Sequence, residues 1–214
     1  MIKDNVLRLL SRLPENILLV AAAKSRSPQE VLEAVSAGVK VIGENYIQEA
    51  ERKYARIGRL AQWHFIGHLQ KNKVKKAVEL FDMLETIDSL DIALEVNKRA
   101  GQLGKIMPVL IEVNSAQEAQ KSGVFPGEAE SLARAISDLK NLKLSGLMTM
   151  GPQVKEPEEL RPYFKLTKEI FDRLKSSNLN NSNMFYLSMG MSDSYRIAIE
   201  EGANVVRIGT AIFG

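Results

Sequence analysis

The sequence predicts an α/β protein: a single closed TIM-type (β/α)8 barrel with one extra helix at its N-terminus. Eight short apolar runs recur along the 214 residues, and helical spacing fills most of the intervals between them. A repeated strand–helix–strand order requires parallel strands covered by helices, and eight strands of near-continuous apolar character suit a closed barrel. We expect one domain spanning residues 1–214. An open, doubly wound sheet is the alternative.

The predicted strands share an apolar character that hardly alternates, as expected for strands buried on both faces. In chain order they are Ile17–Ala23, Val39–Ile42, Trp63–Ile66, Asp82–Thr86, Met107–Val113, Lys143–Met148, Met184–Ser188 and Asn204–Ile208.

The predicted helices combine apolar residues at intervals of three and four with start and stop signals. One helix runs from Pro28 to Val35, with a proline at its first turn and Gly38 beyond its end. The others are an amphipathic helix over Met1–Leu13 that could cover the barrel, Glu128–Leu139, Glu158–Ser176, and a last crossover helix marked by Ile197, Ala198 and Gly202.

Composition and charge exclude several classes of protein. No stretch approaches the roughly 20 apolar residues of a membrane span, and Met1–Val6 lacks the apolar core of a secretory signal. The chain has no cysteine, and His64 and His68 are its two histidines, so we expect neither a disulfide nor a metal site. A net charge of +3 is too small to indicate nucleic-acid binding. We expect a cytoplasmic protein.

Lys24 is the first candidate site residue, because it follows the apolar run of the first strand directly. In a low-dielectric site a lysine loses its proton more easily, and its amine can then attack an aldehyde to form a Schiff base. The alternative is that Lys24 extends to the surface at the end of the strand.

The ends of the last two strands supply a second candidate feature. Ser188–Ser192 offers hydroxyls and Gly190, and Arg207–Thr210 offers a guanidinium, Gly209 and a further hydroxyl. Barrels commonly bind phosphate at the loops after strands seven and eight. Taken with Lys24, these residues predict a phosphorylated ligand with an electrophilic carbon near the lysine. Alternatively, the glycines serve only tight turns.

Two other features have simpler interpretations. His64 lies on a strand, where we expect it to be a satisfied polar residue, and His64 and His68 do not form a helical metal-binding pair. The basic cluster of Lys71, Lys73, Lys75 and Lys76 is typical of a solvated helix face. A secondary anion site at this cluster is the alternative.

Ordered motifs along essentially the whole chain resemble the pyridoxal phosphate homeostasis protein family, small barrels related to the N-terminal domain of alanine racemase. The motifs that carry the resemblance are Val20–Lys24, Gly43–Glu49, Trp63–Lys73, Val113-Asn114, Glu118 with Lys121–Gly123, Gly146–Met150, Leu187–Ser192 and Val206–Gly214.

The resemblance implies pyridoxal 5'-phosphate as the cofactor and assigns its contacts. Lys24 matches the lysine that holds the cofactor as a Schiff base, Arg207 matches the arginine facing the pyridine nitrogen, and Asn45 lies in a motif that lines the pocket. The implied phosphate-binding positions are Ser188, Gly190, Gly209 and Thr210.

The chain departs from the family pattern at three places. The run Met191–Ser194 has its aspartate one position early, so Asp193 receives no role. The first strand ends Ala21-Ala22-Ala23-Lys24, without the usual hydroxyl beside the lysine. Relatives tend to continue for several residues beyond the position of Gly214.

The resemblance implies a cofactor carrier or buffer without efficient catalysis. Arg207 stays protonated, disfavours a protonated ring nitrogen, and so weakens the electron sink that carbanion chemistry needs. Alanine racemase takes a second acid–base group from another domain, which we do not find here, so we assign no catalytic residue. We expect a monomer in transient contact with cofactor-dependent apoenzymes. The alternatives are a weak amino-acid racemase and a sugar-phosphate-binding barrel without a Schiff base.

Overall fold

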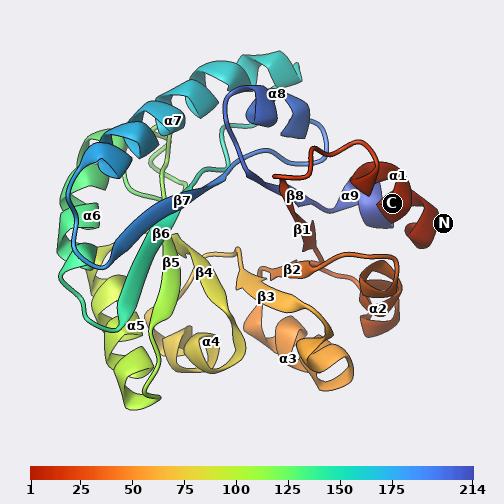
Figure 1. Cartoon of the computed structure of the whole chain (residues 1–214), viewed down its shortest axis with the longest axis horizontal. Coiled ribbons are helices and arrows are strands. Elements are labelled where there is room, and N and C mark those ends of the chain that lie inside the picture. The colour runs from red at the N-terminus through yellow and green to blue at the C-terminus, as the bar shows by residue number, and fades with distance from the viewer.

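The computed structural model describes residues 1–214 and forms a closed barrel of eight parallel strands in sequence order (Figure 1). Hydrogen bonds join β1 to both β2 and β8, which closes the ring. The strands are β1 Leu18–Ala22, β2 Val41–Glu44, β3 Gln62–Phe65, β4 Met83–Ile87, β5 Met107–Glu112, β6 Leu142–Met148, β7 Ser182–Ser188 and β8 Val205–Ile208. The barrel prediction is confirmed.

All eight predicted strands are present, with ends displaced by at most two residues. The clearest difference is β2, which continues past Ile42 through Gly43 and Glu44. Glycine and glutamate are poor strand formers, so the sequence pattern ends the strand too early. In the barrel, Gly43 pairs with Ala22 and His64, and a Cβ on Gly43 would lie 2.7 Å from Val20 Cγ1.

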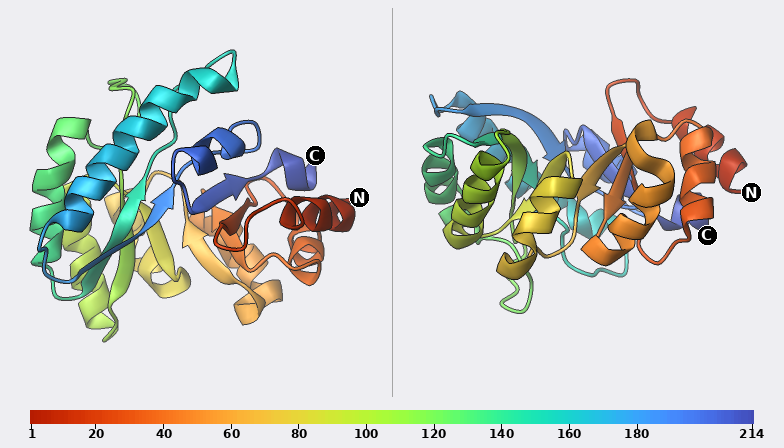
Figure 2. Two further views of the ribbon diagram at one scale, coloured as in Figure 1. Left: turned by 45° about the horizontal axis from the view of Figure 1, so that its top comes forward. Right: turned by 90° about the horizontal axis from the view of Figure 1, so that it is seen from below.

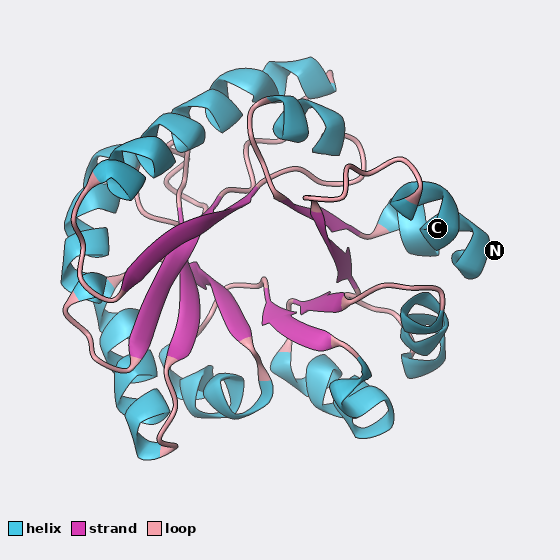
Figure 3. Ribbon diagram, in the orientation of Figure 1, coloured by secondary structure: helices cyan, strands magenta, loops and turns pink.

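The helices surround the strands as an outer ring (Figure 3). They are α1 Ile2–Leu10, α2 Pro28–Ser36, α3 Ile47–Ile57, α4 Val74–Leu80, α5 Leu90–Gln102, α6 Ala129–Ser137, α7 Arg161–Ser176, α8 Tyr195–Glu200 and α9 Thr210–Phe213, with 3₁₀ turns at Gly58–Leu60, Lys71–Lys73, Pro126–Glu128 and Pro157–Leu160. The α2 start is capped as its sequence indicates, because Ser27 accepts a hydrogen bond from the Glu30 amide and Pro28 follows.

The extra N-terminal helix is confirmed, although it is shorter than Met1–Leu13. It ends at Leu10, shortly before Pro14, whose ring disfavours a helical conformation at Leu13. The helix lies on the outer side of the barrel beside α9, so the two chain ends are neighbours (Figure 2). The Asn5 side chain donates to the carbonyl of Ile212 at 3.1 Å.

The carboxyl ends of the parallel strands meet at one end of the barrel, where the loops to the next helices begin. Beneath those loops the strands present an apolar interior broken by a few buried polar side chains, among them His64, Glu85, Ser188 and Arg207. None of the helices is both long enough and apolar enough to cross a membrane.

Candidate functional site

A cavity of about 580 Å³ opens at the carboxyl ends of β1, β2 and β8. It is called the Lys24 cavity below. Its walls are Ala22, Lys24, Arg26, Asn45, Ile66, Met150, Met191, Ser192, Asp193, Arg207, Gly209 and Thr210. The fold therefore gathers five of the seven predicted site residues around one space, from chain segments that are up to 186 positions apart.

Lys24 lies on the turn that follows β1, two residues beyond the strand end, and its side chain is exposed at the cavity mouth. Of the two interpretations that the sequence allows, the exposed side chain agrees with extension to the surface, because the chain has already left the barrel wall at Ala22. The ammonium lies 5.7 Å from the centre of the Tyr46 ring and forms no hydrogen bond or ion pair with the protein. The amine is therefore free to meet a ligand.

The backbone around Lys24 is held more firmly than its side chain. Ser25 adopts a left-handed conformation, with φ of 60°, and its amide donates to Glu49 Oε2 at 2.8 Å. Lys53 Nζ donates to the Ala23 carbonyl at 2.7 Å. The residues on either side of Lys24 thus have fixed partners on α3.

A buried ion pair beneath the turn supplies this anchoring. Lys53 Nζ lies 2.5 Å from Glu44 Oε1 and 3.1 Å from Glu49 Oε2, and both Lys53 and Glu44 are almost inaccessible to solvent. Burial raises the pKa of Glu44 to about 7, although the hydrogen bond and charge of Lys53 oppose the rise. Sequence reasoning missed Lys53, because a lysine in a helix normally faces solvent.

Arg207 forms the floor of the Lys24 cavity and is only 3 % exposed. Its Nη1 donates to Ser188 Oγ at 2.6 Å, and its Nη2 donates to the Thr149 carbonyl at 2.8 Å. Burial lowers the pKa of Arg207, and the nearby carboxylates Glu85 and Glu112 oppose that change. The guanidinium is consequently fixed in position and oriented toward the cavity.

A hydrogen-bonded chain continues from Arg207 into the barrel interior. Ser188 Oγ donates to Glu85 Oε2 at 2.6 Å, and Glu85 Oε1 lies 2.7 Å from His64 Nδ1. Burial tends to raise the pKa of Glu85, but the hydrogen bonds and charges of His64, Arg207 and Ser188 lower it below its ordinary value. His64 is a satisfied polar residue, as predicted.

Ser188 and Gly190 do not line the cavity, so the structure places them differently from the other implied phosphate-binding residues. Ser188 is fully buried, and its hydroxyl is occupied by Arg207 and Glu85. Gly190 has φ of +89°, and a Cβ there would lie 2.6 Å from the Cβ of Ala198. Ser188 affects the cavity indirectly, because it holds Arg207 in position. Gly190 does so because it sets the course of the loop between β7 and α8.

The hydroxyl that the β7–α8 loop does present is that of Ser192. It lines the cavity beside Thr210, and its Oγ accepts a hydrogen bond from the Ala211 amide at 3.3 Å. Ser192 belongs to the same hydroxyl-rich motif as Ser188, so the sequence of that motif could have identified Ser192 as a candidate site residue. Gly209 completes this wall, since a Cβ there would lie 3.1 Å from the Ala22 carbonyl.

The remaining candidates lie away from this cavity. His68 is exposed and lies within 3.3 Å of Asp88. The basic cluster surrounds the start of α4, where Lys71 pairs with Asp91 at 2.5 Å and Lys76 with Glu51 at 2.7 Å. These exposed pairs are what a solvated helix face predicts. No three His, Cys, Asp or Glu side chains are placed to hold a metal ion.

Comparisons with known proteins place the chain among close relatives. The family model described as alanine racemase, N-terminal domain matches residues 1–214. The pyridoxal phosphate homeostasis protein of Aquifex aeolicus is 42 % identical over 197 residues, 92 % of this chain and 86 % of the relative. The protein of that name from Escherichia coli K12 is 38 % identical over 207 residues, 95 % and 87 % of the two chains.

A solved structure agrees with the fold along the full length. The structure of PipY from Synechococcus elongatus with PLP bound superposes with a TM-score of 0.91 at 31 % identity and covers 100 % of both chains.

Proposed function

Because this chain belongs to the alanine racemase N-terminal domain family, and within it to the pyridoxal phosphate homeostasis proteins, we propose that it binds pyridoxal 5'-phosphate and acts as a carrier or buffer of that cofactor. The observation that supports the proposal most directly is the composition of the Lys24 cavity. A lysine amine without a protein partner and a buried guanidinium line the same space, together with the hydroxyls of Ser192 and Thr210.

The cavity residues fit three functional groups of this cofactor: the phosphate, the aldehyde and the ring nitrogen. Ser192 and Thr210 would hold the phosphate, and Gly209 allows a ligand to approach the backbone where a Cβ would fill the space. Arg26 adds a positive charge to the same wall. The bound cofactor supplies an aldehyde carbon that a primary amine can attack, and Lys24 is the amine placed to hold it.

Arg207 would donate to the ring nitrogen and would keep that nitrogen from gaining a proton. Guanidinium has five N–H donors and no acceptor, and Ser188 and Thr149 already fix two of its nitrogens. A ring nitrogen that stays unprotonated makes the cofactor a weaker electron sink. We therefore infer that the protein holds the cofactor without efficient catalysis of its own.

The exposure of the cavity mouth favours transfer of the cofactor to other proteins. Lys24 and Tyr46 are both exposed there, so an acceptor can approach without rearrangement of the barrel. We propose transient contact with cofactor-dependent apoenzymes in the cytoplasm, with the chain acting as a monomer.

The visible spectrum of the protein loaded with pyridoxal 5'-phosphate tests the covalent contact. We expect absorbance that borohydride converts into a permanent attachment, with mass spectrometry locating that attachment at Lys24. Lys24→Ala should lose it, whereas Lys71→Ala, a change at an exposed lysine paired with Asp91, should keep it. A Lys24→Ala protein that retained covalently bound cofactor would falsify the role of Lys24.

Chiral analysis of products separates the carrier from a racemase. The loaded protein is incubated with a panel of L-amino acids, and the fraction of D-enantiomer is followed over time. We expect no steady accumulation. Steady turnover that disappears in Lys24→Ala would replace the carrier with a weak racemase.

A further inference from the structure

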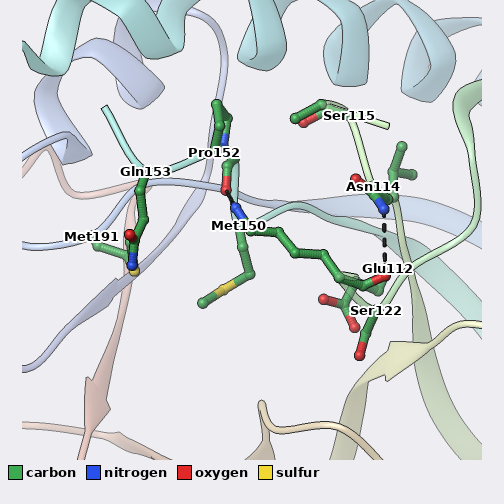
Figure 4. A pocket seen from close by; sticks show the side chains of 12 residues that line it. Glu112, Asn114, Ser115, Ser122, Met150, Pro152, Gln153 and Met191 are labelled. Carbon is green, nitrogen blue, oxygen red and sulfur yellow. Dashed lines mark hydrogen bonds between the residues drawn. The ribbon is translucent and has the colours of Figure 1, made fainter. Parts of the chain in front are cut away.

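A second cavity, of about 320 Å³, lies next to the Lys24 cavity at the carboxyl ends of β5 and β6. Met150 and Met191 line both cavities and form the wall between them. Figure 4 shows Glu112, Asn114 and Ser122 on one side of this space and Met150, Gln153 and Met191 on the other. Its volume is at the lower end of ordinary small-molecule sites, which begin at about 300 Å³. It is called the Glu112 cavity below.

Glu112 is the unusual residue of this wall. It is the last residue of β5, is 7 % exposed, and neither of its carboxylate oxygens has a hydrogen-bond partner in the protein. A buried carboxylate without a donor is costly, and proteins normally pair such groups. The Glu112 carboxylate therefore needs a hydrogen-bond donor that the protein itself does not supply.

Apart from Gln153, which is exposed, the other polar side chains of the wall are already paired within the protein. Asn114 donates to the Glu118 carbonyl at 2.8 Å, Ser115 shares a hydrogen bond with Thr149 at 2.9 Å, and Ser122 lies 3.0 Å from His68 Nδ1. These contacts leave the Glu112 carboxylate as the buried acceptor of the cavity that has no partner.

The Lys121 ammonium, which also lines the cavity, is engaged elsewhere. It lies 2.7 Å from Glu118 Oε1 and 3.3 Å from the Gly151 carbonyl. The charge of Glu118 offsets its positive charge, so Lys121 does not supply the partner that Glu112 lacks.

The charges that face Glu112 favour a cationic partner. Burial and the neighbouring Asp88 raise the pKa of Glu112 to about 7, and Arg207 opposes that rise from the adjacent site. An anionic ligand would be repelled by the carboxylate. A metal ion would need further ligands, and no group of three metal-binding side chains exists here. An organic ammonium needs only a carboxylate and an apolar surface, which the two methionines provide.

We propose that the Glu112 cavity binds a small molecule with a primary ammonium group, with Glu112 as its charge partner and Met150 and Met191 against its hydrocarbon part. Binding at Glu112 requires no cofactor in the Lys24 cavity. When the cofactor is also bound, the ammonium group at Glu112 and the side chain of Lys24 lie on opposite sides of the wall formed by Met150 and Met191.

Methionine methyl signals in a carbon-labelled, cofactor-free protein test this site. Ethylammonium is titrated at pH 8, where Glu112 is mostly ionised, and ethanol, of similar size, serves as the uncharged comparison. Met150→Leu and Met191→Leu assign the two methyl signals. We expect saturable shifts at both methyls with ethylammonium and none with ethanol.

Substitution of the carboxylate identifies the group that binds. Glu112→Gln keeps the shape and should weaken ethylammonium binding about tenfold or more. Glu130→Gln makes the same charge change at an exposed position on α6 and should leave binding unchanged. Equal affinity in Glu112→Gln, equal response to ethanol, or no saturable shift in the native protein would each overturn the proposal. The comparison of the two probes needs no variant, so it stands even if Glu112→Gln folds poorly.

Discussion

The guanidinium of Arg207 donates to the hydroxyl of Ser188 at 2.6 Å, and that hydroxyl in turn donates to Glu85 at 2.6 Å. A single side chain from β7 thus connects a cation on β8 with a carboxylate on β4, across the interior of the barrel. Hydrogen bonds to charged groups in a buried environment are stronger than neutral ones. The position of Arg207 in the Lys24 cavity therefore depends on residues that lie below it.

Removal of the Ser188 hydroxyl should disturb both partners at once. We expect Ser188→Ala to lower the free energy of unfolding by about 1–3 kcal/mol, because Glu85 and Arg207 each lose a buried hydrogen bond. Ser182→Ala, on the same strand, removes a half-buried hydroxyl that donates to Leu179 and should cost less. Urea unfolding measures the difference, and a spectroscopic titration should show weaker cofactor binding in Ser188→Ala alone. Equal losses in the two variants would contradict this connection.

Replacement of Lys53 should be severe, because it leaves Glu44 buried without its cation and removes a donor from Ala23. We expect Lys53→Met to destabilise the protein by about 3–5 kcal/mol. Adding Glu44→Gln to the same chain should recover part of that loss, since the orphaned carboxylate is gone. Chemical denaturation of the two single variants and the double variant measures the coupling. Strictly additive effects would show that the two side chains act independently.

Stability should depend on pH through Glu112. Its pKa is raised from the ordinary 4.5 to about 7 in the folded protein, so the folded state holds a proton that the unfolded state has released between these values. The contribution of Glu112 to the free energy of unfolding is complete below pH 4.5 and is lost as the pH rises through about 7.

Glu112→Gln removes this dependence and leaves that of Glu44 in place. The stability of the variant relative to the native protein should therefore increase from pH 5 to pH 7 and then level off, by about 3 kcal/mol at most. Urea unfolding at a series of pH values measures the two curves. A difference that does not change with pH would mean that Glu112 titrates normally in the folded state.

Gly190 should tolerate a side chain less well than Gly104, although both have positive φ angles. A Cβ at Gly190 meets Ala198 and Tyr195, whereas at Gly104 it meets nothing within 4 Å. Gly104→Ala should therefore show only the conformational cost of about 1 kcal/mol, and Gly190→Ala a larger loss. Thermal unfolding compares them. Cofactor affinity should fall only in Gly190→Ala, because Met191 and Ser192 of the cavity wall follow in the same loop. Equal losses of stability in both variants would rule out a contribution from packing against Ala198 and Tyr195.

The sequence by itself determined the barrel and the identity of the residues at its strand ends. Apolar runs and helix signals are local properties, so the eight strands could be predicted to within two residues. Lys24, Arg207, Gly209 and Thr210 are predicted because they lie at or just beyond the carboxyl ends of such runs, which parallel strands bring together. Asn45 is predicted from the resemblance to the family.

Only the tertiary structure decided which polar side chains meet. Ser188 and Ser192 offer the same hydroxyl in the same motif, yet one points into the barrel and contacts Glu85 while the other lines the cavity. Lys53 gave no local signal that it would be buried, and Glu112, although it lies in a predicted buried strand, gave none that it would lack a partner. The direction of a strand residue depends on register and on closure of β1 against β8, which join residues nearly the whole chain apart. Long-range pairing of this kind leaves no trace in the neighbouring sequence.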